Sequence, residues 1–424
     1  MREGPRTRGA APSRKARRAA VFFVLITILL DTIGFGIIAP VMPKLLTSLT
    51  GEGLDSVVRY SGWLMFVYAA VQFVAAPLLG NLSDRFGRRP VLLMSLVALG
   101  LDYLLMAWAP SLVWLFLGRL LAGLAGATFS TANAYVADVS SDADRARNFG
   151  YISAAWGLGF MLGPAIGGVL GEYGVRVPFV AAAGLAALNV VYGLLVLPES
   201  LPPHRRRAFS FARANPVGAL VQIRRHPAAA ALLLVLVPYQ IAHDANPATW
   251  SYYAMFKFGW STSDVGWSLF VVGASIMLVN GLLVGPAIAR LGERRSVVVG
   301  LAFMSLGFIG FAFATEGWML IASILPFALI GLAQPALRSM MAARVPADAQ
   351  GELQGAVGSL MSLVMIFSPL VMTGIFSYFS APDAPLHFPG AAFLTAGLLG
   401  GVALALFRWA VAREGAALMP APGP

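Results

Sequence analysis

Long apolar segments recur along this chain and are separated by shorter polar ones. Twelve of them reach roughly 20 residues, the length at which a helix crosses the ~30 Å hydrocarbon layer of a membrane. They lack the period-two alternation of β-barrel strands. We therefore expect an all-α polytopic membrane protein, with spans at 20–46, 60–83, 90–109, 112–137, 148–171, 177–197, 228–255, 265–289, 296–314, 318–341, 353–379 and 389–410.

A polar segment rich in proline and arginine divides these spans into two groups of six. Pro198, Pro202 and Pro203 stop the sixth span, because proline cannot continue a helix. Residues 209–225 can form a short amphipathic helix on the membrane surface. The expected organisation is a disordered basic tail (1–19), a six-helix bundle (20–197), a linker (198–227), a second six-helix bundle (228–410) and a second tail (411–424).

An internal repeat relates the two groups of spans. Several small or helix-breaking residues recur at one constant separation, 205 positions, as 285 is from 80. The pairs are Gly80 and Gly285, Gly87 and Gly292, Gly126 and Gly331, Gly150 and Gly355, and Pro164 and Pro369. One constant separation across several helices predicts two pseudo-symmetric bundles, each folded in the same way.

Composition and charge agree with a membrane protein. Hydrophobic residues make up 58% of the chain and charged residues 12%, and the mean hydropathy is +0.77; soluble domains carry about 25% charged residues. There are no cysteines, which excludes disulfides and thiol chemistry. Most of the net charge of +11 lies in the loops on one side, whereas the other side holds only Lys44, Arg59, Arg176 and Lys257. We therefore expect both termini in the cytoplasm, and no nucleic acid is needed to explain the charge.

The loop after the second span carries a specific motif, Gly80-Asn-Leu-Ser-Asp84-Arg85-Phe-Gly87-Arg88-Arg89-Pro90. Its glycines allow a tight turn, and its arginines can pair with carboxylates such as Asp138. The motif resembles the signature of the major facilitator superfamily, which implies a loop that latches the two halves in one state of the transport cycle. The repeat copy, residues 285–295, has Ala289 in the position of Asp84. A loop that only carries positive charge to the cytoplasm is the alternative interpretation.

The fifth span contains small residues about four positions apart and a proline. They are Gly159, Gly163, Pro164, Gly167 and Gly168. Small residues at this spacing let helices approach closely in lipid, so helix packing alone is one interpretation. The pattern also resembles the motif of the drug:proton antiporter branch of the same superfamily, which implies an antiporter.

Further residues of the first half strengthen this resemblance. The first span contains Asp31-Thr32 and Pro40, Asp102 precedes Tyr103 in the third span, and Arg119 lies in the fourth. Together with Asp138, these residues make the first half similar to the tetracycline:proton antiporters. The resemblance implies proton-driven export from the cytoplasm.

At three positions this chain carries a residue that differs from the one typical of the tetracycline:proton antiporters. Met304 stands where members of that family carry an acid in the ninth span, and Ile276 where they carry a histidine in the eighth. Ala122 replaces the glutamine of the fourth span. In the family the first two groups serve proton coupling and the handling of metal–tetracycline complexes. Their loss puts the identity of the drug in question more than transport itself.

Charged residues within the predicted spans are the main candidates for coupling. An Asp or Arg in mid-membrane costs roughly 2.5–3.5 kcal/mol on insertion scales, so it faces a cavity or a partner. Asp31, Asp102 and Asp244 are candidates for proton exchange or for contact with a cationic substrate, and a structural pair with Arg119 is the alternative. His243 adjoins Asp244, but neighbouring residues point about 100° apart on a helix.

Polar and aromatic residues within the spans are candidates for a substrate cavity. In the seventh span they are Tyr239, Gln240, Asn246 and Trp250, and elsewhere Gln72, Asn133, Asn280 and Gln334. Hydrogen bonding between helices is the alternative role for each of them.

The sequence therefore predicts a proton-coupled exporter of tetracycline-like or other amphiphilic drugs in a bacterial-type inner membrane. Transport of one endogenous metabolite, such as a sugar, peptide or lipid, is the alternative, and a receptor or membrane-embedded enzyme a remote one. No nucleotide loop, metal-ligand pair or serine nucleophile motif is found in the sequence. We expect no cofactor or metal and no catalytic residue. The expected partners are lipids, protons and the substrate, and the expected state is a monomer.

Overall fold

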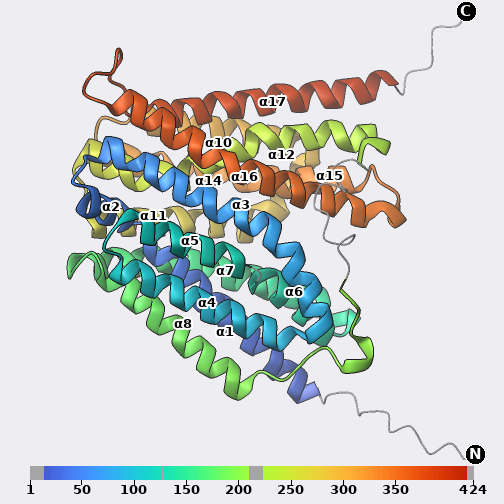
Figure 1. The fold of residues 1–424 in the computed structure, drawn as a ribbon. Coiled ribbons are helices and arrows are strands. Elements are labelled where there is room, and N and C mark those ends of the chain that lie inside the picture. Colours follow the sequence, from blue (N-terminus) through green and yellow to red (C-terminus); the bar gives the residue numbers. More distant parts are fainter. Residues whose placement is uncertain (1–13, 127, 210–222, 418–424) are drawn as a thin grey trace, which may run out of the picture.

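The computed structural model describes residues 14–126, 128–209 and 223–417, and these residues form a bundle of long helices (Figure 1). The first half contains α1 (Arg14–Ile38), α2 (Met42–Thr50), α3 (Leu54–Phe86), α4 (Arg88–Trp108), α5 (Leu112–Ala125), α6 (Thr128–Val139), α7 (Asp142–Glu172) and α8 (Val177–Val196). The surface helix expected at 209–225 lies mainly outside the described residues; Ile223–Arg225 is a 3₁₀ turn.

The second half repeats this pattern with more interruptions. It contains α10 (Pro227–Phe258), α11 (Thr262–Leu278), a π-helical turn (Val279–Leu283), α12 (Val284–Phe313), α13 (Gly317–Ala322), α14 (Ile324–Ala328), a 3₁₀ turn (Leu329–Leu332), α15 (Ala333–Ala342), α16 (Gln350–Ser380) and α17 (Ala391–Ala417). Proline or glycine lies near several of the breaks. Pro40, for example, lies between α1 and α2, where the sequence predicted one continuous span.

Twelve spans follow from these helices. Among the described residues, eleven helical stretches are long and apolar enough to cross a membrane, and one of them, Thr262–Phe313, has 52 residues. That stretch holds two predicted spans, which meet at Gly292, where the backbone leaves the helical region (φ 76°, ψ 165°). Gly87, its partner in the repeat, joins α3 to α4 with similar angles (φ 110°, ψ 159°). The predicted all-α fold of two six-span halves is confirmed.

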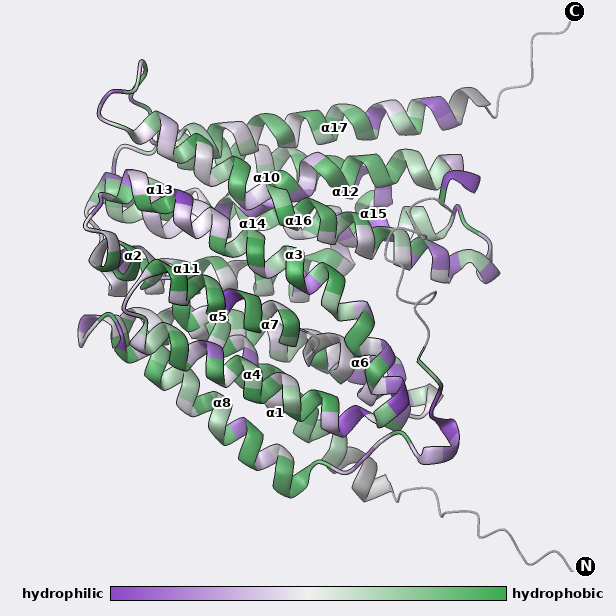
Figure 2. Cartoon of the chain, viewed as in Figure 1, coloured by the Kyte–Doolittle hydropathy of each residue, from purple (hydrophilic) through white to green (hydrophobic). Residues whose placement is uncertain are grey.

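The helices run side by side, so α1 begins and α17 ends at the same end of the bundle (Figure 1). We call this the termini end and the opposite one the far end. Hydrophobic residues cover the length of the helices, while hydrophilic residues gather chiefly at the termini end (Figure 2). This distribution suits a body that is surrounded by lipid along its length.

The two halves contact each other near the far end. In one contact region α7 packs on α11: a methyl group built on Gly168 would lie 2.6 Å from the carbonyl oxygen of Thr262 and 2.9 Å from Gly266 Cα. In the same region Glu172 accepts hydrogen bonds from the hydroxyl of Thr262 and, at 3.0 Å, from the backbone N–H of Ser263. Small residues therefore bring these helices to backbone contact.

The second contact region joins α3 to α16. Gly62 lies against Thr373 and the carbonyl of Pro369. One turn further along α3, the rings of Phe66 and Phe367 are 5.9 Å apart. Toward the termini end, α3 and α16 diverge (Figure 1). The halves thus meet at the far end and separate toward the termini.

Candidate functional site

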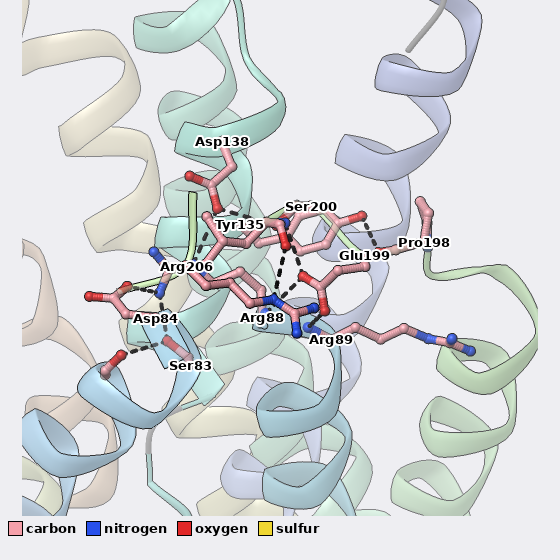
Figure 3. Close-up of polar contacts among 12 residues, drawn as sticks. Ser83, Asp84, Arg88, Arg89, Tyr135, Asp138, Pro198, Glu199, Ser200 and Arg206 are labelled. Atoms are coloured by element: carbon pink, nitrogen blue, oxygen red, sulfur yellow. Dashed lines mark hydrogen bonds and ion pairs between the residues drawn. The ribbon is translucent and has the colours of Figure 1, made fainter. Parts of the chain in front are cut away.

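Residues 80–90, which were expected as a loop, form the end of α3 and the start of α4 with only Gly87 between them, and they make a polar network at the termini end (Figure 3). We keep the name 80–90 loop for this segment. The Arg88 guanidinium lies at the centre of the network. It pairs with Asp84 at 2.6 Å, with Asp138 at the end of α6 at 3.2 Å, and donates a hydrogen bond to the Ser83 hydroxyl at 2.6 Å. The side chain of Arg88 is only 12% exposed, so these contacts are partly shielded from water. The pairing of this loop with Asp138 places three elements of the first half in one network.

Glu199 caps helix α4 from the start of the linker. Its carboxylate accepts hydrogen bonds from the backbone N–H groups of Arg88 at 2.8 Å and Arg89 at 3.3 Å (Figure 3). These N–H groups have no partner within the helix, and a carboxylate at a helix N-terminus also interacts favourably with the helix dipole. The sequence analysis missed Glu199, because the 111 positions between it and Arg88 leave no local signal.

Other linker residues strengthen this attachment. The Tyr135 hydroxyl donates a hydrogen bond to the Pro198 carbonyl at 3.0 Å, and the Ser200 hydroxyl donates one to Asp138 at 3.2 Å. The backbone N–H of Arg207 donates to the Asp84 carbonyl at 3.0 Å. The linker is therefore joined to the 80–90 loop through both its side chains and its backbone.

The remaining arginines of the loop make other contacts. Arg89 donates to the Leu194 carbonyl at 2.7 Å, and the Arg85 guanidinium lies 5.1 Å from the centre of the Phe86 ring. Gly87 has a positive φ that favours glycine, whereas nothing lies within 4 Å of a methyl group built on Gly80. Of the three arginines, Arg88 alone pairs with carboxylates among the described residues.

The glycines of the fifth span divide between two neighbours. Gly159 and Gly163 face α1, with methyl positions 2.9 Å from the Leu29 carbonyl and 2.7 Å from the Ile33 carbonyl, and Gly167 lies against Ile37. Pro164 lies within the continuous helix α7 and against α1, and Gly168 faces α11 of the other half. The motif therefore packs one helix against its own half and against the opposite half.

Asp102 and Arg119 form a buried ion pair between α4 and α5. Asp102 is 0% exposed and Arg119 is 8% exposed. The guanidinium also lies 3.3 Å from the sulfur of Met106 and 5.9 Å from the centre of the Tyr68 ring. Gly118 leaves the space that the Asp102 carboxylate occupies. The structure thus joins two of the predicted charged residues to each other.

Asp31, in contrast, makes no ion pair or hydrogen bond among the described residues. Its Oδ1 atom is buried without a partner. It lies in the middle of the membrane-spanning part of α1, within electrostatic range of the hydroxyls of Tyr68 and Tyr103. A partly buried carboxylate in mid-membrane without a compensating cation is suited to bind and release a proton.

Asp244 has partners on two helices. The Gln240 side-chain amide donates to it at 2.7 Å, and the Ser368 hydroxyl of α16 donates to its other oxygen. His243 Nδ1 lies 3.5 Å from Asp244 Oδ1, although the two residues are neighbours in sequence. Ser368 was not among the residues predicted from the sequence.

The other predicted cavity residues lie in different environments. Trp250 is a correction: it is 1% exposed, donates to Ser268 at 2.9 Å and packs on Phe311 and Phe393, so it belongs to the core of the second half. Gln72 joins two helices by donating to the Gly126 carbonyl at 2.9 Å. Of the remaining residues, Tyr239 and Asn246 are buried, Asn133 and Gln334 are partly exposed, and Asn280 is exposed.

Met304 and Ile276 remain apolar positions in the structure. Met304 is 0% exposed and contacts Gly400 of α17, and Ile276 is partly buried against the hydrophobic core. No group of three or more His, Cys, Asp or Glu side chains that could hold a metal ion occurs in the described part of the chain.

A two-half, twelve-span bundle with ionisable groups at mid-membrane defines the class of the protein: it is a multi-pass membrane transporter and not an enzyme. The chain belongs to the Major Facilitator Superfamily, whose family model matches residues 24–253 and 238–422.

Several relatives cover most of the chain. A tetracycline resistance protein of class C from Escherichia coli is 41% identical over 362 residues, which cover 84% of this chain and 90% of the relative. A class B protein from Escherichia coli is 34% identical, with coverage of 84% and 88%. Multidrug resistance protein 2 of Bacillus subtilis is 27% identical, with coverage of 91% and 94%.

Solved structures share the fold. A mutant of the nucleoside transporter NupG matches with a TM-score of 0.78 at 13% identity and covers 92% of this chain and 99% of its own. The human organic anion transporter MFSD10 matches with a TM-score of 0.68 at 24% identity and the same coverage. At these identities the likeness extends to the fold alone.

Proposed function

We propose that this protein is a proton-driven exporter of tetracycline-like or other amphiphilic drugs. The observation that carries the proposal is the identity of 41% to a tetracycline resistance protein over 84% of this chain. The mid-membrane acid Asp31 supports the coupling to protons, because its partly buried carboxylate has no compensating cation among the described residues. Such a protein needs no cofactor, since the proton gradient supplies the energy, and it works as a monomer with lipids around it.

The orientation follows from charge. The positive residues gather in the loops of the termini end, and cytoplasmic loops carry an excess of Lys and Arg. We therefore place the termini end in the cytoplasm and the far end outside a bacterial inner membrane. The structure then corresponds to a state that is closed outside and separates toward the cytoplasm, from which drug enters. The reverse state forms when the halves rock about the site.

Asp31 is the proton carrier in this scheme. When the site faces outside, where protons are abundant, the carboxylate takes up a proton and becomes neutral. The neutral form tolerates closure of the surrounding helices, whereas the charged form does not. When the site opens to the cytoplasm, water reaches the group and the proton leaves, and a drug then binds in the same cavity. Asp102 is already neutralised by Arg119, so this pair maintains the local charge balance.

The 80–90 loop acts as a conformational latch in the proposed cycle. Arg88 holds Asp84 and Asp138 in the present state, and Glu199 secures the start of α4. Opening on the other side requires the cytoplasmic ends of the halves to meet at this loop. Its contacts must then change.

A second candidate is the transport of one endogenous metabolite by the same mechanism. It is favoured by the apolar side chains of Met304 and Ile276, at positions where the tetracycline antiporters carry ionisable groups. The number of compounds that drive proton movement separates the two functions.

The test is proton movement in proteoliposomes whose interior is acidic and holds a quenched pH dye. Tetracycline and a panel of lipophilic cations are added to the wild-type protein, to Asp31→Asn and to the control Asp383→Asn, whose residue lies in an exposed far-end loop. We expect several drugs to raise the dye signal with the wild type and the control, and none with Asp31→Asn. The absence of a response to any drug from folded wild-type protein would reject drug:proton antiport and favour a metabolite.

A further inference from the structure

A second ionisable group reaches the interior of the membrane from the second half. His243 lies near the middle of the 32-residue helix α10, yet its side chain is 41% exposed. Its ring is inclined by 22° to that of Tyr239, with centroids 6.3 Å apart. Ionisable residues at this depth face a water-filled cavity or the bundle interior, because contact with lipid tails is costly. The exposed ring therefore marks a place that water can reach.

The carboxylate of Asp244 lies beside this ring and accepts a hydrogen bond at each of its two oxygens. Asp244 is 6% exposed, one of its oxygens accepts from Gln240 at 2.7 Å, and the other accepts from Ser368 of α16. Nδ1 of His243 is 3.5 Å from the carboxylate and has no hydrogen-bond partner of its own. The imidazole therefore has a carboxylate on one side and the exposed face of its ring on the other.

Few other charged or polar groups lie near His243 and Asp244 among the described residues. Asp244 and the Arg338 guanidinium of α15 both act electrostatically on the Tyr239 hydroxyl, and Ser368 is the polar contact from α16. Arg338 is exposed and forms no ion pair with Asp244 among the described residues. The carboxylate of Asp244 is therefore not neutralised by an arginine, unlike that of Asp102.

The pair lies at the same depth as Asp31. The hydroxyl of Ser251 in α10 donates to the Ala39 carbonyl just after α1, at 2.9 Å, which fixes the two helices at one level near the far end. Asp31 lies eight residues before Ala39, and Asp244 lies seven before Ser251. At 1.5 Å per residue both acids are roughly 10–12 Å below that contact. Each half thus carries one acid without an arginine or lysine partner, at the same level.

We propose that His243, held by Asp244, is a second proton-binding group of the transport cycle. A proton from cavity water binds an imidazole nitrogen, and the imidazolium and carboxylate together are neutral. When the proton returns to water, the pair carries one negative charge, as does deprotonated Asp31. When no drug is bound, the two halves can then close around the site without an uncompensated charge only when both groups are protonated. Gln240 and Ser368 are positioning residues that fix the carboxylate. This inference rests on the proposed proton-driven function.

The test compares two activities of His243→Asn and Asp244→Asn in proteoliposomes. One is accumulation of labelled tetracycline driven by a pH gradient, and the other is exchange of the same drug at equal pH, which needs no net proton movement. We expect accumulation to fall at least tenfold while exchange stays within about twofold of the wild type. The pH profile of accumulation should lose one ionisation step. Ser368→Ala should shift that profile without abolishing accumulation.

The control is His387→Asn, which changes a histidine in an exposed far-end loop. Wild-type accumulation by His243→Asn, or an equal loss of accumulation and exchange by both variants, would overturn the proposal, since the second result indicates substrate contact. Failure of the drug-exporter function itself is distinct, because the wild-type protein would then accumulate no tetracycline.

Discussion

At the scale of single residues, each ionisable side chain in the membrane interior needs a partner that compensates its charge. The sequence showed which residues were ionisable, and the pairing of Asp102 with Arg119 was one of the alternatives that it left open. It could not select that pairing, because the two residues come from different helices. Nor could it find Ser368, whose hydroxyl meets Asp244 from a distance of 124 positions in sequence. Contacts of this kind depend on helix rotation and depth, which a periodic apolar pattern does not specify.

The buried pair gives a prediction about stability. Asp102→Asn leaves the Arg119 guanidinium buried without its counter-ion, and breaking a buried pair in this way costs about 3–5 kcal/mol. We expect a clear fall in the melting temperature of the purified protein. The double variant Asp102→Asn, Arg119→Gln removes the unpaired charge and should recover part of the loss.

The matched control is Asp144→Asn, which breaks the exposed pair with Arg147 on α7. Exposed pairs contribute only about 0–1 kcal/mol, so its melting temperature should stay near that of the wild type. Equal shifts in Asp102→Asn and Asp144→Asn would show that the buried pair does not hold the two helices.

At the scale of elements, the sequence predicted the helices better than their breaks. Apolar length identified the twelve spans, and the repeat of Gly87 and Gly292 marked the turn between spans in each half. The division of one predicted span into α5 and α6, and of another into α13, α14 and α15, was not predicted. Local residues such as Gly126 permit such breaks, but the packing of neighbouring helices decides whether they occur. The glycines of α7 were predicted as the antiporter motif, with helix packing as the alternative; the contact of Gly168 with the other half was not predicted.

Helix α7 offers a prediction about the contact between halves. Gly168→Ala places a methyl group 2.6 Å from the Thr262 carbonyl, so the halves cannot close fully at the far end. Overpacking of this size costs about 1–3 kcal/mol, which shifts the balance between the two states roughly five- to 150-fold away from the present one. We expect transport to fall accordingly.

Gly157→Ala on the same helix is the control, since nothing lies within 4 Å of its added methyl group. Transport by both variants can be measured as drug efflux from cells that express equal amounts of protein. If Gly168→Ala exported drug as well as Gly157→Ala, the close approach of α7 and α11 would not be needed for the cycle.

At the scale of the whole molecule, the main feature is unequal closure of the two ends. The contact regions of α7 with α11 and of α3 with α16 lie near the far end, and the halves separate toward the termini (Figure 1). The sequence predicted two halves and their orientation, but not which end is closed. Both states use the same residues, and the free-energy difference between them is small compared with the packing within each half.

This state can be detected by cross-linking, because the chain contains no cysteine that would interfere. Glu172→Cys and Ser263→Cys place two thiols on α7 and α11, where the native side chain and backbone are joined by a 3.0 Å hydrogen bond. We expect a short thiol-specific cross-linker to join them readily in the resting protein, and transport to stop when it does. Reduction of a cleavable linker should restore transport. The single-cysteine variants are the controls, and ready cross-linking without loss of transport would show that this end does not need to open.

The closed far end has a consequence for anyone who seeks an inhibitor. In the proposed orientation the entrance faces the cell interior, so a compound that blocks this state cannot reach the entrance directly from the surrounding medium. It must first cross or dissolve in the lipid bilayer, so permeability limits its potency before affinity does. Large hydrophilic molecules, including antibodies, would meet only short connecting loops. The design of an inhibitor must therefore address membrane permeability before binding affinity.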